Sequence, residues 1–169
     1  VSILGSTGSV GTQALEVCVT HGFPVKGLAA HHNEVLLEEQ TRRFRPHLVC
    51  IFDESRYQSF KTRVADLPVK VVTGIEGLCE AASMDEADMV LNAVSGMIGL
   101  RPTLAAIDAH KELALANKET LVTGGELVMR RAKEQNVPIL PVDSEHSAIF
   151  QCLNGYRHCK VKRILLTAS

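Results

Sequence analysis

Three glycines near the start of the chain are spaced to bind an anion. In the segment Val1–Gly11, Gly5, Gly8 and Gly11 recur at every third position between an apolar run and a helical pattern. In such a turn the first glycine permits a tight bend, the second lets the backbone approach a pyrophosphate, and the third allows close contact between helix and sheet. Amide groups at the helix start would hold the anion. The hydroxyl groups that could add donors belong to Ser6, Thr7 and Ser9. The pattern indicates a dinucleotide site, although a glycine-rich turn can also be purely structural.

The end of the second apolar run indicates which dinucleotide would bind. NAD-binding proteins usually place Asp or Glu there, where it bonds the ribose hydroxyl. In this chain the segment reads Ala29-Ala30-His31-His32-Asn33, without an acid. A carboxylate would repel a 2′-phosphate, whereas imidazoles and an amide tolerate it, so NADP is the expected cofactor. The alternative is that the two histidines only cap the helix that follows.

Two carboxylates that follow a later apolar run could bind a metal ion. The sequence there reads Pro141-Val142-Asp143-Ser144-Glu145-His146. In an extended chain residues i and i+2 point to the same side, so Asp143 and Glu145 could converge on one cation. Carboxylate oxygens suit magnesium or manganese, with a third ligand from another segment. The alternative is a helix with Asp143 or Ser144 as its N-cap and an acidic first turn. Taken alone, the two carboxylates favour that alternative.

A lysine at the end of another apolar run is the third candidate. The segment Ala116–Thr120 would lie at the carboxyl edge of a sheet, where open α/β sheets bind ligands. If this turn is extended, Asn117 and Glu119 share one face for a cofactor and Lys118 takes the other. Lys118 would then offer a positive charge to a substrate oxygen. The alternative is a solvated lysine that opens the next helix.

The elements that position these residues follow an alternating pattern, which is typical of a parallel sheet covered by helices. The predicted strands are Val1–Leu4, Val25–Ala30, Leu48–Phe52, Val69–Thr73, Met89–Asn92, Glu112–Ala116, Ile139–Val142 and Lys162–Thr167. The predicted helices are one that begins near Gly11, then Asn33–Arg43, Glu54–Val64, Ile75–Ala82, Pro102–Ala109 and Thr120–Gln135. The sequence therefore predicts a doubly wound, Rossmann-type α/β domain with a mostly parallel sheet over residues 1–142. Residues 143–169 would begin an α/β catalytic domain.

Composition restricts the class of partner. Of 169 residues, 46% are hydrophobic and 22% charged, and the formal net charge is −1, so no overall field favours nucleic acid or a membrane surface. A small molecule is the expected partner. Five cysteines without a C-x-x-C pair argue against a disulfide framework and for a reducing, cytosol-like compartment. Because Val1 and Ser169 both lie at predicted strands, we expect a piece of a longer protein.

The three motifs together resemble the 1-deoxy-D-xylulose 5-phosphate reductoisomerase family. The matching segments are Ile3–Gly11, Ala114–Val122 and Leu140–Gln151, in the same order and spacing. The resemblance implies an NADP-dependent oxidoreductase that rearranges 1-deoxy-D-xylulose 5-phosphate and reduces the resulting aldehyde to 2-C-methyl-D-erythritol 4-phosphate, in non-mevalonate isoprenoid biosynthesis. It implies NADPH and Mg, Mn or Co as cofactors, and a phosphorylated sugar as substrate. It also implies a homodimer formed through residues beyond Ser169, in the bacterial cytoplasm or the plastid stroma.

The resemblance assigns roles to single residues. The implied cofactor contacts are Gly5, Thr7, Gly8, Ser9, Val10, His31, His32, Asn33, Asn117 and Glu119. The implied substrate contacts are Lys118, Ser144, Glu145 and Ser169, the implied metal ligands are Asp143 and Glu145, and the implied catalytic residues are Lys118, Asp143 and Glu145. The family supplies a third metal ligand and phosphate-binding residues further along, so this chain alone should bind nucleotide without turnover. Many members carry Gly-Lys in place of His31-His32, which weakens the expected grip on the 2′-phosphate here.

Two other functions compete with this assignment. A different Rossmann reductase, such as an aspartate-semialdehyde or homoserine dehydrogenase, would need a catalytic cysteine or lysine in another motif. A nucleotide-sensing or scaffold module would bind NADP without chemistry, and Lys118 and the segment Asp143–Glu145 would then have no function.

Overall fold

The computed structural model of the chain describes residues 1–154 and 160–165 and is built on one parallel sheet. Its seven strands are β1 (Ser2–Leu4), β2 (Gly27–Ala30), β3 (Leu48–Ile51), β4 (Lys70–Thr73), β5 (Met89–Asn92), β6 (Glu112–Leu115) and β7 (Ile139–Pro141). They lie in the order β4-β3-β2-β1-β5-β6-β7, and every pair of neighbours is parallel. The strand order reverses between β1 and β5, so the predicted doubly wound sheet is confirmed.

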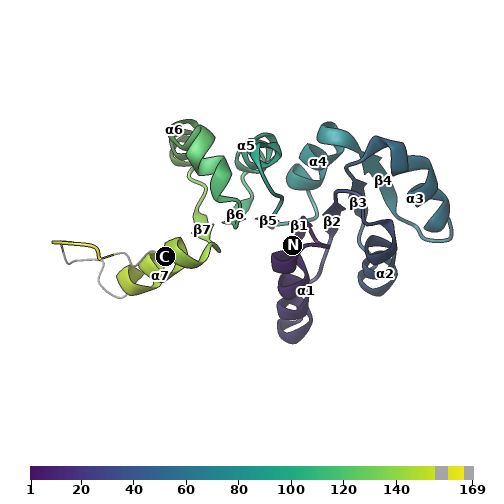
Figure 1. The fold of residues 1–169 in the computed structure, drawn as a ribbon, viewed down its shortest axis with the longest axis horizontal. Helices are drawn as coiled ribbons and strands as arrows, with labels where there is room; N and C mark the ends of the chain where they lie inside the picture. Colours follow the sequence, from purple (N-terminus) through teal and green to yellow (C-terminus); the bar gives the residue numbers. More distant parts are fainter. Residues whose placement is uncertain (155–159, 166–169) are drawn as a thin grey trace.

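Helices cover both faces of the sheet, as Figure 1 shows. The helices α1 (Ser9–His21), α2 (Glu34–Phe44) and α3 (Tyr57–Arg63) pack over one hydrophobic core, which includes Leu15, Leu37 and Phe60. The helices α4 (Gly74–Ser83), α5 (Leu100–Asp108) and α6 (Lys118–Gln135) pack over the other. Burial on both sides explains why β2 and β3 are buried at every residue and read as uninterrupted apolar runs.

The last part of the chain departs from the prediction. Helix α7 (Ser144–Asn154) follows β7 directly at the edge of the sheet. Residues 160–165 have no regular secondary structure, so the predicted strand Lys162–Thr167 is wrong over its described part, and Leu166 and Thr167 lie outside the described residues. Residues 160–164 are exposed, and an apolar run of this kind becomes a strand only where a neighbouring strand accepts its hydrogen bonds.

Smaller differences concern where helices begin. The predicted helix Glu54–Val64 is a 3₁₀ turn, η1 (Glu54–Arg56), followed by α3. A second 3₁₀ turn, η2 (Met97–Gly99), leads into α5, which begins before Pro102, and α6 begins at Lys118. Within the part of the chain that the structure describes, no helix combines the length and the apolar character needed to cross a bilayer.

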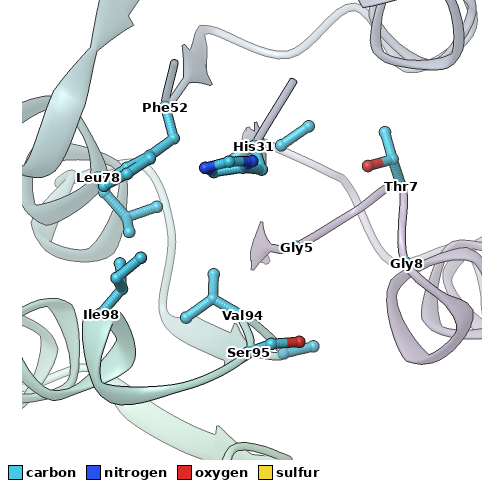
Figure 2. A pocket seen from close by; sticks show the side chains of 12 residues that line it. Gly5, Thr7, Gly8, His31, Phe52, Leu78, Val94, Ser95 and Ile98 are labelled. Carbon is cyan, nitrogen blue, oxygen red and sulfur yellow. The ribbon is translucent and has the colours of Figure 1, made fainter. Parts of the chain in front are cut away.

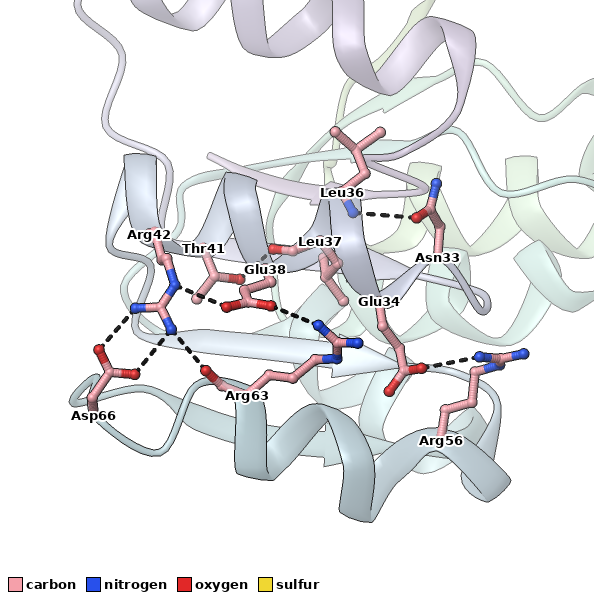
Figure 3. A network of polar contacts seen from close by, with 10 residues as sticks. All are labelled: Asn33, Glu34, Leu36, Leu37, Glu38, Thr41, Arg42, Arg56, Arg63 and Asp66. Atoms are coloured by element: carbon pink, nitrogen blue, oxygen red, sulfur yellow. Dashed lines mark hydrogen bonds and ion pairs between the residues drawn. The ribbon is translucent and has the colours of Figure 1, made fainter.

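Helices α2 and α3 are tied together by an exposed network of charges (Figure 3). Arg42 donates to Glu38, to both oxygens of Asp66 and to the carbonyl oxygen of Arg63, while the Arg63 guanidinium donates to the second Glu38 oxygen. The hydrogen bond from Arg42 is the main cause that lowers the pKa of Asp66. Exposed ion pairs contribute little stability one by one, so the network mainly fixes how α3 sits against α2. A further pair, Arg56 with Glu34, lies at the end of α2 nearest the sheet edge where ligands are expected.

Candidate nucleotide and metal site

A pocket opens at the carboxyl edge of the sheet, where the strand order reverses. It has a volume of about 390 Å³. Its walls come from the turn after β1, the ends of β2 and β3, helix α4, and the segment after β5. Figure 2 shows the glycine turn on one side of the pocket and the apolar side chains of Phe52, Leu78 and Ile98 on the other, with His31 between them. The pocket thus offers a polar end and an apolar end to one elongated ligand.

The three glycines of the first turn differ in the space around them and in backbone conformation. Gly5 has a φ of 88°, and a side chain there would also meet the Ala93 carbonyl oxygen at 2.6 Å. A side chain on Gly11 would lie 2.2 Å from the Gly5 oxygen, so only glycine lets α1 pack this closely on the turn. Gly8 is different, because its added Cβ would meet only the Gly5 oxygen at 3.4 Å. This is the arrangement expected of a turn that leaves its middle glycine open to a ligand.

The start of α1 supplies the donors for an anion. The amides of Ser9, Val10 and Gly11 lie in the first helical turn, where helix geometry provides no carbonyl partner. No acidic residue stands in this turn to compete for them, and among the described residues no side chain caps the helix. The amides of Gly5 and Ser6, by contrast, both donate to the Ala29 carbonyl at 2.8 Å. An anion would therefore be held from the helix side of the turn.

Ser6 has a structural role, and its hydroxyl does not serve as the donor to an anion that the sequence suggested. It is fully buried, and its Oγ donates to Gln40 Oε1 at 2.7 Å, so it is not available to a ligand. Gln40 Nε2 donates in return to the Ser6 carbonyl at 2.9 Å. Gln40, from the middle of α2, thus holds the glycine turn by two hydrogen bonds. The sequence signal for this role is a glutamine at a core-facing position of α2, between Leu37 and Phe44, because a buried amide needs hydrogen-bond partners.

The variant Gln40→Met should loosen the glycine turn while it keeps the side-chain volume. We expect NADPH affinity to fall roughly tenfold, because the Ser6 hydrogen bonds that position the anion-binding amides are lost. Affinity for adenosine 2′-monophosphate, which lacks the pyrophosphate, should stay within about twofold; an equal loss for both ligands would show a general structural effect. Titration calorimetry of the two ligands measures this difference.

The residues after β2 lie at the rim of the same pocket. His31 lines the pocket and stacks on Phe52, with ring centroids 5.4 Å apart. His32 is exposed beside it. The alternative role, in which the two histidines cap α2, is wrong, because Asn33 is the N-cap and its Oδ1 accepts from the Leu36 amide at 3.2 Å. The imidazoles are therefore left free of a capping role.

The Lys118 segment is helical, so the expected extended turn is wrong. Lys118 and Glu119 lie in the first turn of α6, and both are exposed. Asn117 is the N-cap and is 2% exposed. Its Oδ1 accepts from the amide and the hydroxyl of Thr120, and its Nδ2 donates to the carbonyls of Val94 and Gly96. Asn117 thereby ties α6 to the loop after β5, which lines the pocket.

Ser144 and Glu145 are also helical rather than extended, and Asp143 directly precedes their helix. Asp143 stands at the start of α7, its carbonyl accepts from the Ser147 amide at 2.8 Å, and its Oδ1 lies 3.5 Å from the His146 amide. The capping alternative is thus what the structure shows, since these residue types also suit a helix start. Ser144 and Glu145 fall in the exposed first turn. Among residues 1–154 and 160–165, no group of three His, Cys, Asp or Glu side chains is placed for a metal ion.

The structure nevertheless brings two of the predicted residues together. Lys118 Nζ, from the end of β6, lies 3.7 Å from Asp143 Oδ2, from the end of β7. Partial burial alone would raise the pKa of Asp143, but the His146 amide, the Lys118 ammonium, the His146 imidazole and a hydrogen bond with Glu145 lower it. Asp143 is therefore a carboxylate, the form that a metal ion binds.

The remaining predicted residues fall into two places. Gly5, Thr7, Gly8 and His31 share the pocket beside β1. Ser144 and Glu145 line a second hollow of about 460 Å³, together with Cys152 and Arg163. Ser169 lies outside the described residues.

Comparisons with known proteins identify the family. A family model described as 1-deoxy-D-xylulose 5-phosphate reductoisomerase matches residues 1–125, and one described as the C-terminal domain of that enzyme matches residues 139–169. Proteins of the same name from Lachnospira eligens and Lachnoclostridium phytofermentans are 56% and 54% identical over the whole chain. The chain spans 45% and 44% of their lengths.

Solved structures of the same enzyme are also similar to this chain. The enzyme of this name from Zymomonas mobilis, in complex with NADPH, is 40% identical with a TM-score of 0.85, over 89% of this chain and 40% of that one. A structure of the enzyme with NADPH, fosmidomycin and magnesium has a TM-score of 0.85 at 39% identity, over 89% of this chain and 38% of that one. Biliverdin reductase from Synechocystis, at 16% identity and a TM-score of 0.52, shares the fold alone. The chain belongs to the 1-deoxy-D-xylulose 5-phosphate reductoisomerase family.

Proposed function

We propose that this chain is the nucleotide-binding part, with the first metal ligands, of an enzyme that converts 1-deoxy-D-xylulose 5-phosphate to 2-C-methyl-D-erythritol 4-phosphate with NADPH and a divalent cation. The observation that carries the proposal is the position of two candidate sites at the same edge of one parallel sheet. The pocket with the glycine turn follows β1 and β2, and the Lys118–Asp143 pair follows β6 and β7. Open α/β sheets bind ligands at this edge.

The residues of the pocket fit a phosphorylated dinucleotide. The open Gly8 and the first-turn amides of α1 would hold the pyrophosphate, with Thr7, Ser9 and Val10 around it. His31, His32 and Asn33 would lie beside the adenosine ribose and its 2′-phosphate. Asn117 and Glu119 remain proposed cofactor contacts, and the hydrogen bonds of Asn117 make a positioning role the better supported one.

The Lys118–Asp143 pair, together with Ser144, Glu145 and Arg163 of the second hollow, offers polar groups for a phosphorylated sugar and a cation. A bound divalent cation acts as a Lewis acid on substrate oxygens, and NADPH supplies the hydride. Asp143 and Glu145 would provide carboxylate oxygens, while Lys118, Ser144 and Ser169 would hold the substrate. We place the boundary between the nucleotide-binding and catalytic domains at residues 142 and 143. Family membership supports a homodimer in the bacterial cytoplasm or the plastid stroma.

Nucleotide titration tests the cofactor assignment. The chain should bind NADPH more tightly than NADH, because no carboxylate stands at the end of β2 to favour a free ribose hydroxyl. Isothermal calorimetry at low salt measures both affinities. Comparable affinities would refute the role of residues 31–33, and the absence of binding by either nucleotide would refute the proposed function.

Manganese titration tests the metal assignment. Asp143→Asn should weaken Mn²⁺ binding roughly tenfold or more, because the amide offers a neutral oxygen in place of a charged one. Asp108→Asn is the matched control, since that aspartate is the last residue of α5 and is paired with Arg131 of α6. Equal affinity of the wild type and Asp143→Asn in paramagnetic titrations would remove Asp143 from the metal site.

A further inference from the structure

The two histidines at the rim of the pocket contact each other directly. His31 Nδ1 lies 2.9 Å from His32 Nδ1, and the two rings meet edge to face, with an interplanar angle of 86°. The His31 ring is fixed from its other side by the stacking on Phe52. At this distance the two nitrogens share a hydrogen bond, so one Nδ1 carries a proton and the other accepts it.

This contact limits the charge of the pair. With one proton between the Nδ1 atoms, each Nε2 remains able to carry a proton of its own. The pair is neutral when one Nε2 is protonated and carries one positive charge when both are. A second positive charge would require protons on both Nδ1 atoms, which would then face each other at 2.9 Å and break the contact. A nearby anion favours the protonated form of an imidazole, so a phosphate bound beside the pair would favour its charged state.

The charged groups near the pair already interact with one another, so the pair is the cation that an added anion can bind. The Asp53 amide donates to the His31 carbonyl at 2.9 Å, so the segment after β3 lies against the pair. A hydrogen bond from Ser55 is the largest cause that lowers the pKa of Asp53, and the charges of Arg56 and His31 lower it further. Arg56 is already paired, with Nη1 2.9 Å from Glu34 Oε2 and Nε 3.6 Å from Asp53 Oδ2.

We propose that His31 and His32 act as one specificity-determining pair that takes up a proton when the 2′-phosphate of NADPH binds. This inference rests on the proposed function, because it requires NADPH in the pocket. The dianionic phosphate stabilises the charged state of the pair, and NADH, which lacks this phosphate, does not. The preference for NADPH therefore strengthens as pH falls from 8.5 to 6.5, a range in which the phosphate itself remains mostly dianionic.

Calorimetry at pH 7.5 in two buffers with different ionisation enthalpies, HEPES and Tris, counts the protons that binding takes up. We expect uptake of about half a proton per NADPH and none per NADH. The ratio of NADH to NADPH dissociation constants should fall about fivefold to tenfold between pH 6.5 and pH 8.5. In the double variant His31→Gln/His32→Gln, both the uptake and the pH dependence should disappear.

Controls separate this inference from the proposed function. Both histidines are exposed, so their substitution leaves the core intact. His21→Gln, at the far end of α1, should keep the proton uptake of the wild type. NADPH binding without proton uptake, or with the same uptake in the double variant, would overturn the role of the pair and leave the proposed function standing. If neither nucleotide binds, both proposals fail.

Discussion

The variant Gly11→Ala should lose about 3 kcal/mol of folding stability, because its methyl group overlaps backbone that cannot move aside. The added Cβ would lie 2.2 Å from the Gly5 oxygen and 2.6 Å from the Ser6 Cα. Relief requires α1 to move away from the turn, which would also separate its first-turn amides from the pocket. Urea unfolding measures the loss of stability, and we expect NADPH binding to be lost with it.

Gly8→Ala is the matched control within the same turn. Gly8 has a φ of −82°, which alanine adopts readily, and its Cβ would meet only one oxygen at 3.4 Å. We expect a cost of no more than about 1 kcal/mol in stability. NADPH affinity should still fall more than roughly tenfold, because the methyl group occupies the approach of the pyrophosphate. Unchanged affinity in Gly8→Ala would make the turn a structural one.

Asn117→Ala should cost about 3 kcal/mol of folding stability, as much as Gly11→Ala. The substitution removes the cap of α6 and the hydrogen bonds of Asn117 with the buried Thr120 hydroxyl and the Val94 carbonyl. The Gly96 carbonyl keeps only the Gly99 amide, at 3.3 Å. Since Val94 lines the pocket, nucleotide affinity should fall as well. Thermal or urea unfolding of the variant provides the measurement.

Asn33→Ala provides the comparison for Asn117→Ala, since Asn33 is also an asparagine N-cap. Asn33 is exposed and makes a single hydrogen bond, to the Leu36 amide at 3.2 Å. Its replacement should cost only about 1 kcal/mol. Equal costs for the two variants would show that the additional bonds of Asn117 do not stabilise the loop after β5.

Much of the fold could be predicted because its information is local. The strand Met89–Asn92 is observed with the predicted bounds, and each of the other strands up to β7 is found within its predicted range. A strand buried on both faces is apolar throughout, and that signal does not depend on distant residues. The glycine turn was predictable for the same reason, because all three glycines act within one strand–turn–helix unit.

The parts that were missed depend on tertiary contacts or on ambiguous residue types. Asp-Ser-Glu suits both an extended metal-binding segment and a helix start, and the sequence around Asp143 does not decide between them. The partner of Ser6 is 34 residues away, so its hydroxyl looked available to a ligand until the position of α2 was known. The same is true of Asn117, whose partners Val94 and Gly96 belong to another loop.

The candidate site residues all lie at one edge of the sheet, and the opposite edge carries none of them. Every loop that carries a candidate site residue follows a strand, whereas the loops that precede strands lie at the opposite edge. Residues 22–24 lie in one of these loops, between α1 and β2, and are exposed. An affinity tag inserted there would lie at the opposite edge of the sheet from the nucleotide pocket, so it should leave nucleotide binding unobstructed.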